Sequence, residues 1–171
     1  MQRPEPTEYH PYFQRYMDLV GPGDFWELFS KNTEEASQFF SDIPYEKEMY
    51  SYAPGKWTIR QILMHIIDTE RVFAYRALVC GREDSQTILP NMDENHYADH
   101  IDVSKIPLSD LIREFQSVRE SNRYLFKGLS EAQTRFKING PEKPFTARAL
   151  GYLMMGHVLH HMQIIRERYS I

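Results

Sequence analysis

Four long stretches of the sequence carry apolar residues at intervals of three and four, and this pattern constrains the fold more than any other feature. Apolar residues at such intervals lie on one face of an α-helix. The stretches are residues 24–42, 58–80, about 107–127 and 146–168. Capping or breaking residues bound them, as Thr58 does at one start and Gly128 at one end. Four amphipathic helices bury their apolar faces against one another, so the sequence predicts an all-α four-helix bundle.

Shorter elements fill the rest of the chain. Residues 82–106 form a long connection between the second and third long helices, with a short helix expected near 93–98. A connection of this length suggests that the topology is not simply up-down-up-down, and we expect it to place those two helices apart. We also expect a helix over 8–19, a short helix over 130–136, and a loop over 137–145 that holds Gly140, Pro141 and Pro144. No repeat or shift in composition divides the chain, so residues 1–171 are expected to form a single domain.

Charge and hydropathy exclude several classes of protein. With 20 Lys and Arg against 24 Asp and Glu, the net charge is −4, so the basic footprint of a nucleic-acid-binding domain is missing. No stretch reaches the ~18 apolar residues of a membrane span, and the polar N-terminus lacks the apolar core of a signal peptide. These features predict a cytoplasmic protein that binds neither membrane nor nucleic acid. The single cysteine and seven histidines mean that a metal site would use imidazole and carboxylate groups.

Three histidines are candidate metal ligands because of their spacing. His157 and His161 lie four residues apart on the last predicted helix, so they share one face of it. His65 lies midway along the second, beside its apolar face. If these two helices are adjacent, the three imidazoles can converge and leave a coordination position open, which is the catalytic arrangement. The alternative is that each is an ordinary buried histidine, hydrogen-bonded within the core.

Three further residues are candidates for supporting roles around such a site. Asp68 follows His65 by three residues and could orient its imidazole. Glu94 lies in the long connection, which could cover the site as a lid. His160 lies near the face of His157 and is expected to pack against the site or support it.

The remaining polar and aromatic residues favour structural interpretations. We expect Glu70 to pair with solvent or with Arg71, and His96 and His100 to form a solvated surface pair. Cys80 has no neighbouring base, which predicts a buried structural thiol. The aromatic side chains of the first two predicted helices are expected to lie in the core.

Two stretches resemble the DinB/YfiT-like family. Residues 54–68, PGKWTIRQILMHIID, are similar to the family's Lys-Trp-Thr opening and first histidine, and residues 156–163, GHVLHHMQ, to its His-x-x-His-His signature. Parts of residues 70–95 also look like a DinB-like subgroup. The sequence departs from the family at Met162, where relatives often carry arginine followed by glycine.

The resemblance implies a four-helix bundle of the DinB/YfiT-like type, in which His65, His157 and His161 hold one divalent ion, most often zinc or nickel. Members are frequently homodimers. Characterised relatives join low-molecular-weight thiols to small molecules or isomerise them with a thiol, and many others are named metal-dependent hydrolases. The function expected is therefore a thiol-dependent S-transferase or a hydrolase acting on a small molecule. The alternative is a non-catalytic metal-binding or stress-associated helical module.

Overall fold

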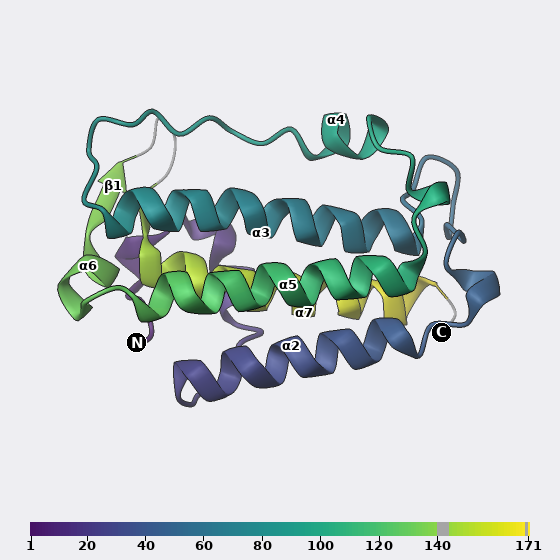
Figure 1. The fold of residues 1–171 in the computed structure, drawn as a ribbon, viewed down its shortest axis with the longest axis horizontal. Coiled ribbons are helices and arrows are strands. Elements are labelled where there is room, and N and C mark those ends of the chain that lie inside the picture. Colours follow the sequence, from purple (N-terminus) through teal and green to yellow (C-terminus); the bar gives the residue numbers. More distant parts are fainter. Residues whose placement is uncertain (140–143, 170) are drawn as a thin grey trace.

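The computed structural model describes residues 1–139, 144–169 and 171, and four long helices form its body (Figure 1). These are α2 (Phe25–Ser41), α3 (Ile59–Gly81), α5 (Leu108–Lys127) and α7 (Ala147–Arg168). All four lie where the apolar periodicity predicts them. The side chains of Asp24, Thr58 and Thr146 accept hydrogen bonds from backbone N–H groups in the first turns of α2, α3 and α7. Because these N–H groups have no partner within their helix, local sequence determines where the helices begin.

The helices are arranged as two antiparallel sets. α2 and α7 run in one direction along the bundle, and α3 and α5 run in the other (Figure 1). α3 packs against both α5 and α7, and α2 packs against the same two helices. α2 and α3 therefore lie on one diagonal of the bundle. The contact between α3 and α7 brings together the two helices that carry the candidate histidines.

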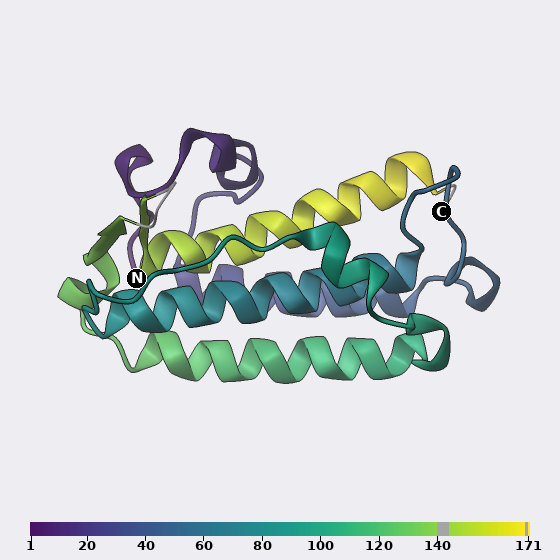
Figure 2. The ribbon, with the colours of Figure 1, turned by 90° about the horizontal axis from the view of Figure 1, so that it is seen from above.

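The connection between α3 and α5 extends back along α3 (Figure 2). It contains α4 (Glu94–Asp99) and a 3-10 turn (Val103–Lys105), which confirms the predicted long connection with a short helix. The expectation that it places α3 and α5 apart is wrong, because the two helices are parallel neighbours. The chain leaves α3 at one end of the bundle and must return to the other end before α5 can run parallel to it. The length of the connection thus reflects helix direction, and not separation.

The N-terminal segment differs from the helix predicted over 8–19. It consists of two 3-10 turns (Pro6–Glu8 and Pro11–Phe13) and the one-turn helix α1 (Gln14–Met17). Pro11 has no backbone N–H and holds the preceding residue, His10, in an extended conformation, with φ −68° and ψ 141°. A continuous helix is therefore interrupted, and the segment crosses over α7 instead (Figure 2).

The remaining elements are short. They are a 3-10 turn (Tyr45–Lys47), α6 (Glu131–Arg135), β1 (Lys137–Asn139) and β2 (Pro144–Thr146). The two strands pair antiparallel, with Ile138 opposite Phe145, where a loop was predicted. The predicted turn residues Gly140 and Pro141 lie outside the described residues.

A layer of polar side chains divides the buried core. One apolar cluster contains the C-terminal half of α3 and the N-terminal half of α7, and the second contains the opposite halves of both helices. Between them lie Glu70, Arg119 and Asn122, which are joined by hydrogen bonds, together with His65 and His157. Within the described part of the chain, no helix is long and apolar enough to cross a bilayer.

Candidate metal centre

The imidazoles of His65, His157 and His161 converge between α3 and α7. Nε2 of His157 lies 3.1 Å from Nε2 of His65 and 3.0 Å from Nε2 of His161. The three side chains each offer a nitrogen within 4.8 Å of the other two, and the described residues contain no other such cluster of metal-ligating groups. His157 and His161 share one face of α7, as their spacing predicts, and His65 meets them from α3.

This geometry fits a divalent cation better than hydrogen bonds among the rings. Each Nε2 has one in-plane site, either a proton or a lone pair, so His157 cannot form good hydrogen bonds to both neighbours at once. Three imidazoles on a tetrahedral ion with N–metal bonds of about 2.0–2.1 Å would place their nitrogens roughly 3.3 Å apart. The observed separations of 3.0 and 3.1 Å are close to that value. Such a donor set leaves one position open to water or a substrate atom.

Burial keeps these imidazoles in the form that binds metals. His65 is 6% exposed, His157 5% and His161 9%. Burial lowers the pKa of His65 to about 4. Burial, and then the neighbouring imidazoles, also lower the pKa of His157 and of His161 well below 6.5. All three rings are therefore neutral at pH 7, with lone pairs available as ligands.

Aromatic packing, and not hydrogen bonding, orients two of the rings. Nδ1 of His65 and Nδ1 of His157 are buried without a hydrogen-bond partner among the described residues. The ring of Trp57 packs on His65 with centroids 4.7 Å apart, and Tyr16 meets His157 edge-to-face at 5.6 Å. Trp57 belongs to the Lys-Trp-Thr motif just before α3, so the sequence could have pointed to a role for it beside His65. Tyr16 carried no such signal.

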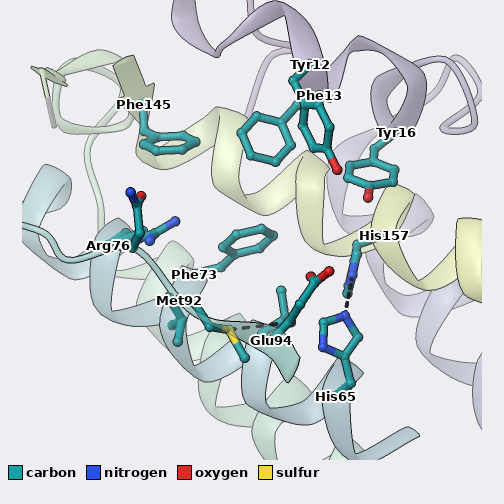
Figure 3. Close-up of a pocket in the computed structure, with 13 residues that line it drawn as sticks. Tyr12, Phe13, Tyr16, His65, Phe73, Arg76, Met92, Glu94, Phe145 and His157 are labelled. Carbon is teal, nitrogen blue, oxygen red and sulfur yellow. Dashed lines mark hydrogen bonds between the residues drawn. The ribbon is translucent and has the colours of Figure 1, made fainter. Parts of the chain in front are cut away.

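A cavity of about 360 Å³ opens onto His65 and His157 (Figure 3). α3 contributes Phe73 and Arg76 to its walls, and the other walls come from the N-terminal segment, the long connection and β2. Its size is within the range of small-molecule sites. Three aromatic side chains of the N-terminal segment line this cavity: Tyr12, Phe13 and Tyr16. Phe13 and Tyr16 also belong to the buried core, as expected, whereas Tyr12 is 52% exposed.

The three predicted supporting residues occupy different positions. Glu94, at the start of α4, lines the cavity and directs its carboxylate toward the histidines (Figure 3). His160 is half-buried, with its ring centroid 5.1 Å from that of Tyr16 and 5.4 Å from that of His161. Asp68 is ion-paired with Arg71 at 3.6 Å, and burial, opposed by Arg71, raises the pKa of its carboxyl group. Asp68 is not hydrogen-bonded to Nδ1 of His65.

The structure agrees with the environments expected for His96, His100 and Cys80, but not with that expected for Glu70. His96 and His100 are exposed, as expected, with ring centroids 4.1 Å apart. Cys80 is fully buried, and burial raises the pKa of its thiol to about 12, which confirms a structural thiol. The expectation for Glu70 is wrong. It points into the bundle, is fully buried and pairs with Arg119 of α5, because it lies on the face of α3 that meets α5, whereas Arg71 faces outward.

Fold and site together define a four-helix-bundle protein with a buried cluster of three histidines at a cavity. The chain belongs to the DinB superfamily, whose family model matches residues 28–165. A protein of Bacillus mycoides (strain KBAB4) that carries the name "Putative metal-dependent hydrolase" is 28% identical over 138 residues, which cover 78% of this chain and 79% of that protein. The membership confirms the family resemblance seen in the sequence.

Two solved structures share the fold. YfiT from Bacillus subtilis, described as "a probable metal-dependent hydrolase with an unusual four-helix bundle topology", superposes with a TM-score of 0.68 at 16% identity, covering 97% of this chain and 93% of its own. A mycothiol-dependent maleylpyruvate isomerase gives a TM-score of 0.65 at 11% identity, covering 88% of this chain and 59% of its own. At these identities the likeness concerns the fold alone.

Proposed function

We propose that this protein is a metal-dependent enzyme that acts on a small molecule. His65, His157 and His161 hold its one divalent ion, which is zinc or nickel. The observation that carries the proposal is the convergence of three neutral Nε2 atoms beside a cavity of about 360 Å³. Membership of a superfamily with relatives named as metal-dependent hydrolases supports it. We further propose that residues 1–171 form one domain and that the protein is a homodimer, as the family resemblance implies.

When bound, the ion would supply a Lewis acid that makes a water or thiol ligand more acidic. The chain's own residues supply the surroundings. The three imidazoles, held neutral by burial, leave one side of the centre facing the cavity. Phe73 and the aromatic side chains of the N-terminal segment exclude water around a ligand. Glu94, an exposed carboxylate directed toward the histidines, is placed to accept the proton that the nucleophile releases.

The reaction that we propose is transfer of a low-molecular-weight thiol to an electrophilic small molecule, with hydrolysis as the alternative. The chain itself does not supply the nucleophilic sulfur, since Cys80 is fully buried. A thiol must therefore arrive as a cosubstrate. The solved structure of a mycothiol-dependent isomerase with this fold supports thiol chemistry on such a scaffold.

Metal content tests the ligand assignment. The protein should be purified without a polyhistidine tag, because a three-histidine site can take up nickel from the column. We expect about one divalent ion per chain in the wild type, its loss in His65→Ala and His157→Ala, and its retention in His96→Ala, which removes an exposed histidine. A chelator should lower the melting temperature of the wild type and leave that of His65→Ala unchanged. Unchanged metal content in His65→Ala would refute the assignment.

A conjugation screen tests the reaction. The metal-loaded protein is incubated with several low-molecular-weight thiols and a panel of electrophiles, and with esters and amides in the absence of thiol. We expect thiol adducts that form with the wild type and not with His65→Ala, and a slower reaction with Glu94→Gln at unchanged metal content. Hydrolysis without thiol would favour the alternative. Metal binding without any turnover would support a non-catalytic module.

A further inference from the structure

Four arginine side chains are buried in the described residues, and one of them differs from the others. Arg60, Arg119 and Arg148 each have a carboxylate partner, contributed by Glu48, Glu70 and Glu8 respectively. Arg76 is 9% exposed and forms no ion pair within the described part of the chain. Burying a charge is costly unless it is paired. Among the described residues, Arg76 is thus the buried arginine whose charge lacks the carboxylate partner that the other three have.

The contacts of Arg76 leave most of its hydrogen-bonding capacity unused. One guanidinium nitrogen donates to the carbonyl oxygen of Pro90 at 2.8 Å, and the guanidinium carbon lies 5.5 Å from the ring centroid of Phe145. A guanidinium has five N–H donors, arranged to match a carboxylate at two points. Arg76 lines the same cavity as His65 and His157 (Figure 3). The Arg76 guanidinium is therefore a cation at the cavity wall, and most of its N–H groups remain available to a ligand.

We propose that Arg76 binds the carboxylate of a small-molecule ligand in this cavity. A single guanidinium matches one negative charge, and the neighbouring rings of Phe73 and Phe145 suit an apolar or aromatic body attached to it. The ligand class is thus an amphiphilic monocarboxylate. This inference names a substrate class for the proposed function and rests on that function for the role of the histidines.

The position of Arg76 along α3 orients the ligand. Arg76 follows His65 by 11 residues, which is about three helical turns, so both side chains lie on the same face roughly 16 Å apart along the axis. Helical side chains lean toward the N-terminus, so Arg76 leans toward His65. Glu94 lies beside the histidines and repels a carboxylate at that end (Figure 3). A bound ligand would therefore place its carboxylate at Arg76 and its reactive part near the histidines.

Matched acid and amide probes test the proposal without turnover. Binding of phenylacetate and phenylacetamide, and of naphthylacetate and naphthylacetamide, is measured by calorimetry on protein kept metal-free with a chelator, so that an ion cannot bind the acid. We expect the wild type to bind each acid at least about tenfold more tightly than its amide, as charge-assisted hydrogen bonds allow. Phenyl phosphate, which has a higher charge, should bind more weakly than phenylacetate.

Arg76→Gln is the informative variant, because glutamine keeps an N–H donor for Pro90 but has no charge. Its acid-to-amide ratio should fall to about one. Arg82→Gln removes an exposed arginine at the end of the same helix and should behave as the wild type does. Equal affinity of the wild type for acid and amide, no binding of either at millimolar concentration, tighter binding of phenyl phosphate, or an equal loss in Arg82→Gln would overturn the proposal.

A second measurement needs no variant, in case Arg76→Gln fails to fold. Phenylglyoxal modifies accessible guanidinium groups, and peptide mass spectrometry locates the modified arginines. We expect phenylacetate, and not phenylacetamide, to slow modification of Arg76 while leaving that of Arg82 unchanged. Absence of this protection would count against the proposal. Because the probes bind metal-free protein, failure of the metal assignment and failure of the Arg76 assignment give separate results.

Discussion

Glu70 of α3 and Arg119 of α5 form an ion pair at the centre of the bundle, with Nε 2.5 Å from Oε1 and both side chains 1% exposed. Asn122 donates to the other carboxylate oxygen at 3.2 Å, and Arg119 also donates to the carbonyl of Met154 on α7 at 3.3 Å. Burial raises the pKa of Glu70 and lowers that of Arg119, and their mutual attraction opposes both shifts. Arg119 donates as well to Oγ1 of Thr33 on α2 at 3.4 Å. One polar network therefore joins all four long helices.

Breaking this pair should destabilise the fold severely. Arg119→Met leaves the Glu70 carboxylate buried without its partner, and we expect a loss of about 3–5 kcal/mol in the free energy of unfolding. Lys31→Met, in a pair whose side chains are 72% and 53% exposed, should cost less than about 1 kcal/mol. Urea denaturation measures both. Similar losses in the two variants would show that the buried network is not important for stability.

Gly156, the residue before His157, should not tolerate a side chain. A Cβ atom there would lie 2.1 Å from the backbone oxygen of Tyr16, and backbone cannot move aside as a flexible side chain can. We expect Gly156→Ala to destabilise the protein by about 1–3 kcal/mol and to weaken metal binding, because Tyr16 packs on His157.

Gly128→Ala is the control for this substitution, since its Cβ would meet nothing closer than 3.5 Å. Urea unfolding and metal titration measure the two effects. An alanine at 156 with the stability of the wild type would mean that the N-terminal segment does not lie against α7 as described.

The Glu8 carboxylate should make stability depend on acid pH. Burial opposes its ionisation, but hydrogen bonds from Arg148, the backbone of Glu5 and Thr146 outweigh burial and lower its pKa from 4.5. A lowered pKa in the folded state contributes stability that is complete above the unfolded value of 4.5 and is lost as the pH falls through the folded value.

Glu8→Gln should therefore lower the free energy of unfolding at pH 7 by about 2 kcal/mol, and the difference from the wild type should shrink below pH 4.5. Glu35→Gln, at a carboxylate that is 53% exposed, should leave the pH profile nearly unchanged. Denaturation at a series of pH values makes the comparison. A Glu8→Gln deficit that is constant with pH would argue against the linkage.

The Cys80 thiol should be inert in the folded protein. With its pKa raised to about 12 by burial, only about one in ten thousand of these thiols is ionised at pH 8. We expect no alkylation by iodoacetamide at pH 8 without urea and complete alkylation in urea, read by mass spectrometry. Leu78→Cys, at a position that is 38% exposed on the same helix, should react in the folded state. Fast alkylation of native Cys80 would reopen its use as a nucleophile.

Much of the fold could be predicted because its causes are local. Helical periodicity depends on residues three and four apart, and caps such as Thr58 act within one turn, so the four long helices were found. The spacing of His157 and His161 places them on one face of α7 for the same reason. Two local predictions were wrong. The helix predicted over 8–19 gave too little weight to Pro11, and the loop predicted over 137–145 missed the pairing of β1 with β2.

The other features of the fold and the site depend on contacts between residues that are far apart in the sequence. That α3 and α5 are parallel neighbours, that Glu70 faces Arg119, and that Trp57 and Tyr16 orient the histidines all depend on which helix faces meet. Arg76 carries no sequence signal either, because only the packed structure shows which buried arginines have carboxylates. The sequence by itself determined the four long helices and the placement of His157 and His161 on one face of α7. Only the tertiary structure decided how His65 approaches the other two imidazoles, where the cavity lies, and that Arg76 has no carboxylate partner among the described residues. Periodicity describes the faces of a single helix, whereas such pairing depends on which faces of two helices meet.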